Sequence, residues 1–428
     1  MAALILSLFF VLMAVGVPVG FVLGLTSLIG FHKLGNPVYL SMLSQRFFSA
    51  MDSYTFLALP LFLLAGDIMN KVGLTGRIVN FSNLFFGRLR GGLAQVNIVS
   101  SIIFGGISGS AVADTAALGS IFIPAMTKDG YGRDFSAAVT AASSIIAPII
   151  PPSIIMVIYG GIMGVSIAGL FAAGIVPGLM IGLGLMIWTR YYAGKRNYPK
   201  HKVEFSVRRV ANETRHAIWA LLMPAIILGG ILGGVFTPTE AAAVAVAYAL
   251  ILGMVFYRNI TLKDLYGLFY RNAVFLGVII LILSSAAVLA WLLTIEHIPE
   301  KVADYFLSIT TNKYLLLLLI NLLLIVVGML MDITASLIIM GPILAPLAAQ
   351  VGVHPLHFGI IMCVNLNIAL ITPPMGGCLF TAMMVGNVGF VDLVKSIFPF
   401  ILVELVVLFI VVYVPPITLF VPKLLGLI

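Results

Sequence analysis

The chain has 428 residues, of which 61% are apolar and 9% are charged, and its mean hydropathy is +1.18. Soluble domains are roughly 45–50% apolar and about 25% charged, so this composition excludes a soluble protein and also a disordered one. A membrane span needs about 20 residues, so the length allows on the order of ten spans and leaves no room for a folded soluble domain. The sequence therefore predicts an all-α polytopic membrane protein.

Hydropathy predicts apolar helices in chain order at 2–30, 56–70, 93–126, 136–168, 170–189, 217–235, 238–257, 272–293, 314–349, 356–388 and 394–421. The segments 93–126 and 314–349 are too long for one crossing and have small or polar residues at their centres, so we expect re-entrant hairpins there. The segments 136–168 and 356–388 contain diprolines, which cannot sit inside a helix. We expect both of these helices to be broken at Pro-Pro and unwound at mid-membrane.

The distribution of basic residues agrees with this topology. If both hairpins return to the side from which they enter, one side of the membrane holds the segments 71–90, 128–133, 190–215, 258–271 and 392–395. These segments carry 18 of the 23 Lys and Arg residues, which marks that side as the cytoplasm. The net charge of +8 is explained by this bias, so it does not indicate nucleic-acid binding.

The two halves of the sequence contain the same parts in the same order. Asp332 follows Asp114 by 218 residues, and the second diproline follows the first by 222. Because the first hairpin enters from the cytoplasm and the second from outside, the repeats have inverted topology, which is typical of secondary transporters. We expect a first repeat at 1–200, a linker and connecting span at 201–237, and a second repeat at 238–428.

Unwound backbone at membrane depth exposes carbonyl groups, and this is tolerated only where they line a cavity or coordinate a ligand. Carbonyl oxygens suit a hard cation such as Na⁺. The sequence therefore predicts two Na⁺ sites, each formed by a hairpin tip and a Pro-Pro break. The first would use Gly106, Ser108, Ala147, Ile150 and Pro152, and the second Gly328, Thr372 and Met375. The alternative is that the glycines only pack helices and the prolines only kink them.

Helix N-termini at the same breaks offer free amides to an anion, which favours an organic acid near Ser110, Ser153, Thr334 and Thr115. A carboxylate at membrane depth is costly and usually functional, so Asp114 and Asp332 are candidates for substrate binding or for proton transfer. The alternative is that each carboxylate caps a helix. For Glu240, three residues after Thr237, we expect the capping role.

Enzymatic and channel functions fit the sequence less well. The stretch from Gly106 to Gly109 matches the Gly-x-Ser-Gly pattern of rhomboid-type intramembrane proteases, but all six histidines fall in expected loops or span ends, away from Ser108. The two aspartates lack the motifs of aspartyl intramembrane proteases, and no nucleotide-binding loop occurs. Two separate cation sites suit alternating access better than a continuous pore. We therefore expect a transporter and no enzymatic activity.

At these residues the sequence resembles the large membrane subunit (M subunit, DctM-like) of the TRAP (tripartite ATP-independent periplasmic) transporters, and the similarity runs over essentially the whole chain. The motifs that carry it are Phe104-Gly-Gly-Ile-Ser108-Gly-Ser110-Ala-Val-Ala-Asp114-Thr, Ala147-Pro-Ile-Ile-Pro-Pro-Ser153, Gly328-Met-Leu-Met-Asp332 and Thr372-Pro-Pro-Met375-Gly. The resemblance implies Na⁺-coupled uptake through a bacterial or archaeal inner membrane by an elevator mechanism. It implies backbone ligands for Na⁺ at both sites, and Ser110, Asp332 and Ser153 facing the substrate.

The resemblance also implies two protein partners, a periplasmic substrate-binding protein and a small four-helix membrane subunit that would be a separate chain. Substrates of the family are mostly carboxylates, and we favour sialic acid over C4-dicarboxylates because no second basic group is evident at the pocket. The alternative is a self-sufficient cation- or proton-coupled anion transporter or channel. We expect the hairpins and broken helices to move against fixed spans and amphipathic connectors near 77–90 and 258–271, whose basic residues would contact anionic membrane lipid.

Overall fold

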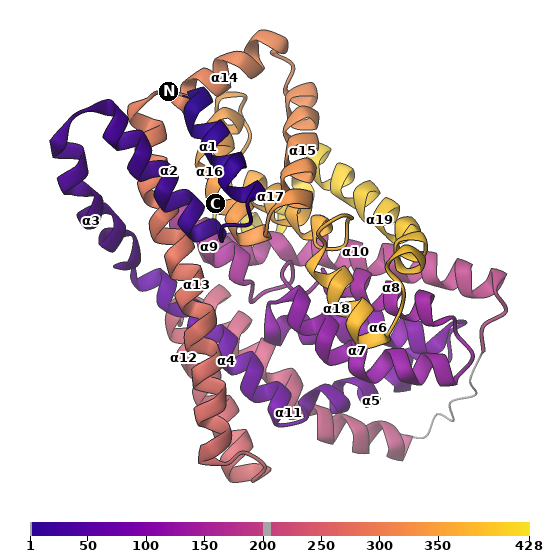
Figure 1. The fold of residues 1–428 in the computed structure, drawn as a ribbon. Helices are drawn as coiled ribbons and strands as arrows, with labels where there is room; N and C mark the ends of the chain where they lie inside the picture. The colour runs from indigo at the N-terminus through magenta and orange to yellow at the C-terminus, as the bar shows by residue number, and fades with distance from the viewer. Residues whose placement is uncertain (1, 200–206) are drawn as a thin grey trace.

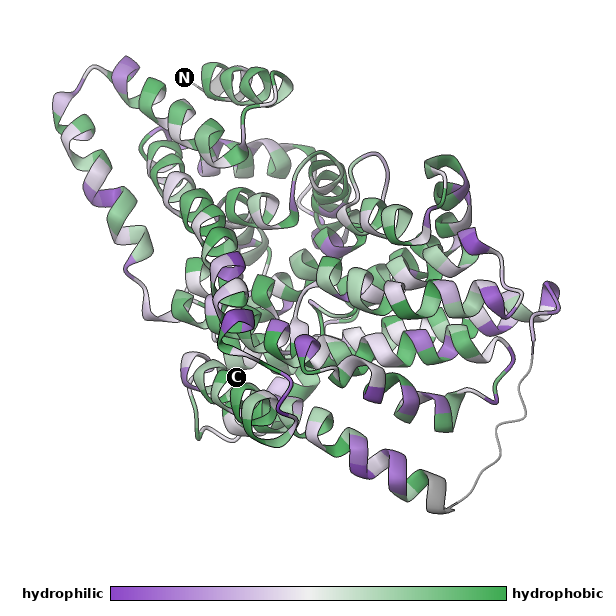
Figure 2. Ribbon diagram, turned by 60° about the horizontal axis from the view of Figure 1, so that its bottom comes forward, coloured by the Kyte–Doolittle hydropathy of each residue, from purple (hydrophilic) through white to green (hydrophobic). Residues whose placement is uncertain are grey.

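The computed structural model describes residues 2–199 and 207–428, and every element in these two ranges is a helix (Figure 1). Hydrophilic residues gather at helix ends and in connections, while the helix bodies are largely apolar (Figure 2). Within the described ranges, 7 helices are long and apolar enough to cross a membrane, or 8 if one bent pair counts as a single span. The prediction of an all-α polytopic membrane protein is confirmed.

Each half of the chain contains a hairpin followed by a helix that is broken into two parts. The first half contains α1 (Ala2–Ala14), α2 (Val19–Leu34), α3 (Pro37–Met51), a 3₁₀ turn (Tyr54–Leu57), α4 (Ala58–Lys71), α5 (Leu74–Phe86), α6 (Gly92–Ser108), α7 (Ala111–Lys128), α8 (Arg133–Ser144), α9 (Ile154–Met163) and α10 (Ile167–Lys195). The second half contains α11 (Val207–Leu232), α12 (Pro238–Ile251), a π-helical turn (Leu252–Phe256), α13 (Leu262–Ile295), α14 (Ile298–Ile309), α15 (Lys313–Leu330), α16 (Ile333–Gln350), α17 (Pro355–Ala369), α18 (Gly377–Gly386), α19 (Phe390–Tyr413) and α20 (Pro416–Leu424). The repeat boundaries at 200/201 and 237/238 stay predictions, and residues 200–206, at the start of the expected linker, lie outside the described residues.

Both long segments fold back on themselves, as predicted. Asn97 of α6 donates a 2.7 Å hydrogen bond to Thr140, and a Cβ atom placed on Gly119 of α7 would lie 3.5 Å from the same threonine. The two arms of the first hairpin therefore run side by side. In the second hairpin, Lys313 at the start of α15 donates a 3.0 Å hydrogen bond to the carbonyl of Gly352, just beyond α16. That hairpin thus begins and ends on one side.

Both diproline helices are broken, also as predicted. α8 and α9 are separated by the segment 145–153, and α17 and α18 by the segment 370–376. Each gap contains a cis Pro-Pro peptide bond. The half-helix after each break packs against the hairpin of the other repeat, α9 on α16 and α18 on α7. Such reciprocal packing is what repeats related by a pseudo-two-fold axis produce.

Four expectations about the remaining helices were wrong, and one of them is that 394–421 is a single helix, because the structure divides it into α19 and α20. The segment 2–30 is two helices, because Gly16 adopts a φ of +87° and Pro18 cannot continue a helix. Helix α3, which the sequence analysis missed, precedes α4 at an angle of 52°. The expected connector at 258–271 is mostly the first part of the continuous 34-residue helix α13. The true counterpart of α5 is α14, since both come directly before a hairpin.

The helices form two groups. A block contains the hairpins, the broken helices and α10, α19 and α20, and a frame contains α1–α5 and α11–α14. In the frame, α13 packs on α2, α3 and α4, and α12 packs on α4. Figure 1 shows the long helix α13 along one edge of the molecule. The frame meets the block where α4 and α5 contact α6, and where α13 and α14 contact α16.

Candidate functional site

The tip of the first hairpin lies directly against the first break. A Cβ atom placed on Gly105 would lie 2.6 Å from the Cα of Ala147, and one on Gly109 would lie 2.6 Å from the carbonyl oxygen of Pro152. No real Cβ tolerates such distances, so glycine is required for the two backbones to approach this closely. Gly109 also has a φ of +59°, a conformation that favours glycine. The sequence thus brings two stretches of bare backbone together.

The residues predicted to form the first Na⁺ site all belong to this tip or to this break. The predicted ligands are Gly106, Ser108, Ala147, Ile150 and Pro152. Their backbone carbonyls accept no hydrogen bond from any residue that the structure describes. Unpaired carbonyls inside a membrane protein are costly unless a ligand satisfies them. Their oxygens are the type of ligand that a hard cation prefers.

The second hairpin and the second break make a similar contact. A Cβ atom placed on Gly328, near the end of α15, would lie 2.6 Å from the Cβ of Ala369, the last residue of α17. The break that follows contains Thr372 and Met375. Among the described residues, no donor bonds to the carbonyls of Gly328, Thr372 or Met375. The Met375 side chain is exposed and lines an apolar cavity of about 620 Å³ beside Leu330, which suits lipid or detergent better than an organic acid.

Three helices begin at these tips and breaks, and their N-cap residues are predicted substrate contacts. Ser110 caps α7 by accepting a hydrogen bond from the Ala113 amide at 3.4 Å. Ser153 caps α9, and Asp332 caps α16 by accepting from the Thr334 amide at 2.8 Å. Each cap lies beside the positive end of a helix dipole, where an anion is stabilised. The capping role of Asp332 is therefore real, and it leaves the second carboxylate oxygen available to another partner.

Two of the predicted hydroxyl ligands are already engaged with their own backbone. Ser153 is fully buried and donates to the carbonyl of Pro148 at 2.5 Å. Thr115 is fully buried in α7 and donates to the carbonyl of Ala111 at 2.8 Å. A substrate that reached either side chain would have to replace these bonds. Their role as substrate contacts stays a prediction.

The block contains two buried carboxylates, Asp114 in the first hairpin and Glu404 in α19. Asp114 is fully buried in α7 next to the hydroxyl groups of Ser101 and Ser144, and the capping alternative for it was wrong because Ser110 caps that helix. Glu404 of α19 is also fully buried and has no hydrogen-bond partner among the described residues. The sequence analysis assigns no role to Glu404, although a single carboxylate in an apolar run indicates a functional residue.

The expected helix cap at Glu240 lies in the frame, at the start of α12. Glu240 and Thr237 form a reciprocal pair at the start of α12, in which the Thr237 amide donates to Glu240 at 2.8 Å and the Glu240 amide donates to Thr237 at 3.3 Å. The structural interpretation of Glu240 is confirmed.

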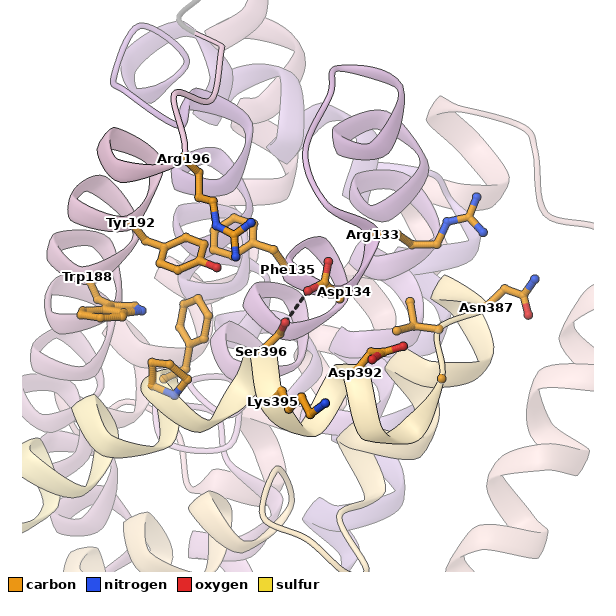
Figure 3. A pocket seen from close by; sticks show the side chains of 14 residues that line it. Arg133, Asp134, Phe135, Trp188, Tyr192, Arg196, Asn387, Asp392, Lys395 and Ser396 are labelled. Carbon is orange, nitrogen blue, oxygen red and sulfur yellow. Dashed lines mark hydrogen bonds between the residues drawn. The ribbon is translucent and has the colours of Figure 1, made fainter.

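A separate polar cavity of about 620 Å³ opens at the other end of α8 (Figure 3). Arg133, Arg196 and Lys395 line it together with two carboxylates, Asp134 and Asp392. Asp134 accepts a 2.5 Å hydrogen bond from the Ser396 hydroxyl. The cavity and the break lie at opposite ends of α8, whose 12 residues span roughly 18 Å. The cavity is therefore about that far from the predicted first Na⁺ site. The cavity was not predicted from the sequence, and it is not part of the hairpin site.

Comparison with protein families gives one match that spans most of the chain. The model described as "Tripartite ATP-independent periplasmic transporter, DctM component" matches residues 6–417. The chain is 40% identical to the sialic acid TRAP transporter large permease protein SiaM of Vibrio cholerae, over 96% of both chains. It is 36% identical to the C4-dicarboxylate TRAP transporter large permease protein DctM of Pseudomonas aeruginosa, over 92% of both.

One longer relative and one solved structure are also similar to this chain. The chain is 40% identical to the isethionate TRAP transporter permease protein DctMQ of Oleidesulfovibrio alaskensis, and the match covers 96% of this chain but 65% of that one. Among solved structures, the YdaH transporter of Alcanivorax borkumensis matches over 87% of each chain with a TM-score of 0.57 and 16% identity. At that identity the likeness is one of fold alone.

Proposed function

The chain belongs to the DctM component family of tripartite ATP-independent periplasmic transporters, and we propose that it imports an organic acid together with Na⁺. As a large TRAP permease it is a multi-pass inner-membrane protein of a binding-protein-dependent transporter. The observation that carries the Na⁺ proposal is the pair of backbone contacts between hairpin tip and Pro-Pro break. Each contact gathers carbonyl groups that no described residue satisfies, and the two contacts occur at matching places in the two halves.

An organic acid is supported by the helix N-termini at the same places. Ser110, Ser153 and Asp332 cap three helices there, and Thr334 lies in the first turn of one of them. None of these residues is basic, so a single anionic group bound by amides and hydroxyls fits better than two carboxylates, each needing a cation. The relatives are named for sialic acid and for isethionate at the same 40% identity, so identity does not select a substrate. We propose sialic acid as the first substrate to test.

The block and the frame support an elevator mechanism. The hairpins and broken helices, which hold the candidate ligands, pack mainly on one another, while α4, α5, α13 and α14 of the frame contact them at the hairpins. We propose that the block carries substrate and Na⁺ across the membrane against the frame. A small membrane subunit would support the frame, and a periplasmic binding protein would deliver the substrate.

Uptake of labelled sialic acid into proteoliposomes tests the proposed substrate and partners. The liposomes hold this chain with its small subunit, and the cognate binding protein is added or omitted. We expect uptake only with the binding protein. The rate of uptake by Ser110→Ala should be lower by about tenfold or more, because one hydrogen bond to a charged group is worth roughly 1.5–3 kcal/mol. Ser120→Ala, an exposed serine on the same helix, serves as the matched control and should transport normally.

The outcomes of this assay separate the substrate from the mechanism. If only dicarboxylates or a sulfonate are taken up, and only with the binding protein, the substrate assignment is wrong and the tripartite one holds. Uptake that needs no binding protein would favour the alternative, a self-sufficient anion transporter.

A further inference from the structure

The first hairpin carries a carboxylate, Asp114, that no described side chain neutralises. It lies in the first turn of α7 and is fully buried, and neither of its oxygen atoms has a hydrogen-bond partner among the described residues. No basic side chain in the ranges that the structure describes forms an ion pair with it. Taking a charged group out of water costs free energy unless hydrogen bonds or an opposite charge compensate it. The position of Asp114 therefore suits a ligand that supplies positive charge.

The polar groups next to Asp114 offer oxygen lone pairs and no protons. The hydroxyls of Ser101 and Ser144 lie beside the carboxylate. Ser144 donates its proton to the carbonyl of Thr140 at 2.8 Å. Ser101 donates its proton to the hydroxyl oxygen of Ser143 at 3.0 Å, because Ser143 itself donates to the carbonyl of Thr140. A hydroxyl has one proton and two lone pairs, so both oxygens keep lone pairs for a cation.

The second repeat lacks this polar cluster. Ser110 and Asp332, the N-caps of α7 and α16, are 222 residues apart, and so are the two diprolines. At the same offset, the counterparts of Asp114, Ser101 and Ser144 are, in that order, Ser336, Leu323 and Leu366. A hairpin and a broken helix of this kind therefore fold without a buried carboxylate and without its two hydroxyl neighbours. The cluster serves a purpose that the fold alone does not require.

The cluster lies next to the candidate Na⁺ site of the first repeat. Ser101 precedes Gly105 by four residues in α6, and Gly105 is the residue whose backbone meets Ala147. One turn of helix, roughly 5 Å, thus separates the cluster from the carbonyl site. The predicted ligands of the carbonyl site carry no charge. Two cations at such a separation repel each other, and the negative charge of Asp114 offsets this repulsion.

We propose that Asp114, Ser101 and Ser144 bind a third Na⁺, in addition to the two proposed above. Carboxylate and hydroxyl oxygens suit a hard cation. A single carboxylate balances one positive charge, so a monovalent cation fits, whereas a divalent one would leave a buried charge uncompensated. This proposal rests on the proposed Na⁺ coupling and extends it, because Asp114 becomes a cation ligand and not a substrate contact or a proton carrier.

Equilibrium binding of ²²Na⁺ to the purified complex of this chain with its small subunit, without substrate, tests the proposal. We expect the unaltered chain to bind three Na⁺ and Asp114→Asn to bind two, because an amide cannot balance the charge of the cation. Ser144→Ala should bind one of the three about tenfold more weakly. The lost oxygen contact is comparable to a hydrogen bond to a charged group.

Two matched controls remove similar groups elsewhere in the block. Glu404→Gln neutralises the other fully buried carboxylate and should bind three Na⁺. Ser136→Ala removes an equally buried hydroxyl of α8, one that donates to the carbonyl of Gly132, and should bind all three with unchanged affinity. A thermal unfolding curve shows whether each variant is folded. If Asp114→Asn is not, Ser144→Ala decides, and an unchanged affinity in that variant overturns the proposal.

The remaining outcomes separate this site from the proposed function. Two Na⁺ bound by the unaltered chain, or three bound by Asp114→Asn, would overturn the third site and leave the two carbonyl sites standing. Loss of more than one Na⁺ in Asp114→Asn would also overturn it, because the residue would then support the carbonyl sites. An unaltered chain that binds no Na⁺ would overturn the proposed Na⁺ coupling itself.

Discussion

The side chain of Asp332 has an observed role as a helix cap and a proposed role in transport. Its carboxylate accepts the Thr334 amide at the start of α16, at the tip of the second hairpin. The sequence left two roles open for this residue, a helix cap and a substrate contact. The structure establishes the cap, and the cap places the carboxylate where substrate binding is proposed.

Replacing Asp332 with Asn separates the two roles. Asparagine caps helices about as well as aspartate, so the thermal stability of Asp332→Asn should stay within about 0.5 kcal/mol of the unaltered protein. Uptake should nevertheless fall at least about tenfold, because the free carboxylate oxygen, which can only accept a hydrogen bond from the substrate, becomes an NH₂ group that can only donate one. Asp304→Asn, at an exposed position on α14, is the control and should change neither quantity. Normal uptake by Asp332→Asn would show that this residue caps α16 and does not take part in transport.

Some properties of single residues follow from the sequence and others do not. The tip glycines and the diprolines are recognisable because only these residue types permit bare backbone contacts and chain breaks. The burial of Asp114 and Glu404 was not predictable, because it depends on how α7, α8 and α19 pack. Helix α19 is far from α7 and α8 in the chain, and no local pattern records how it packs on them.

Helix α4 of the frame meets the tip of the first hairpin at a glycine. A Cβ atom placed on Gly66 would lie 3.2 Å from the Cα of Ser108 and 3.8 Å from its Cβ. Helix α4 is therefore in direct contact with a residue of the candidate Na⁺ site. If the block moves against the frame, this contact must break during each transport cycle.

A disulfide between these two positions should therefore lock the transporter. The separation of 3.8 Å equals the mean Cβ to Cβ distance of a disulfide, about 3.8 Å, so Gly66→Cys with Ser108→Cys should crosslink with little rearrangement. Uptake should stop on oxidation and return on reduction, while each single variant should not respond to oxidant. The two native cysteines, Cys363 and Cys378, are buried and should not interfere. Full uptake by the completely oxidised double variant would contradict an elevator movement at this contact.

Among the elements, the interrupted helices could be predicted and the connectors could not. Hairpins and broken helices carry their own signals, excess length and diprolines. The sequence predicts an amphipathic connector at 258–271. It is instead mostly the first part of α13, whose start is capped by Thr261 and Asp264 and is tied to α4 by the 2.9 Å ion pair between Lys71 and Asp264. Helix α14, the true connector, is a short amphipathic helix of 12 residues that follows α13 almost directly.

At the scale of the whole molecule, the two halves are interlocked. Each half-helix that follows a break packs on the hairpin of the other half, so neither candidate Na⁺ site can move without the other. The order of the parts could be predicted from hydropathy and from the diprolines. The interlocking could not, because it is a contact between segments more than 170 residues apart, as with α9 and α16. This arrangement leads us to expect that both sites load and unload together.

The most direct test of the central claim is substrate uptake driven by one ion gradient at a time. Proteoliposomes with this chain, its small subunit and its binding protein are given an inward Na⁺ gradient without a pH difference, or an inward proton gradient without Na⁺. If the paired backbone sites bind Na⁺, only the Na⁺ gradient drives accumulation. Accumulation driven by the proton gradient in the absence of Na⁺ would contradict the account, and would point instead to proton transfer by a buried carboxylate.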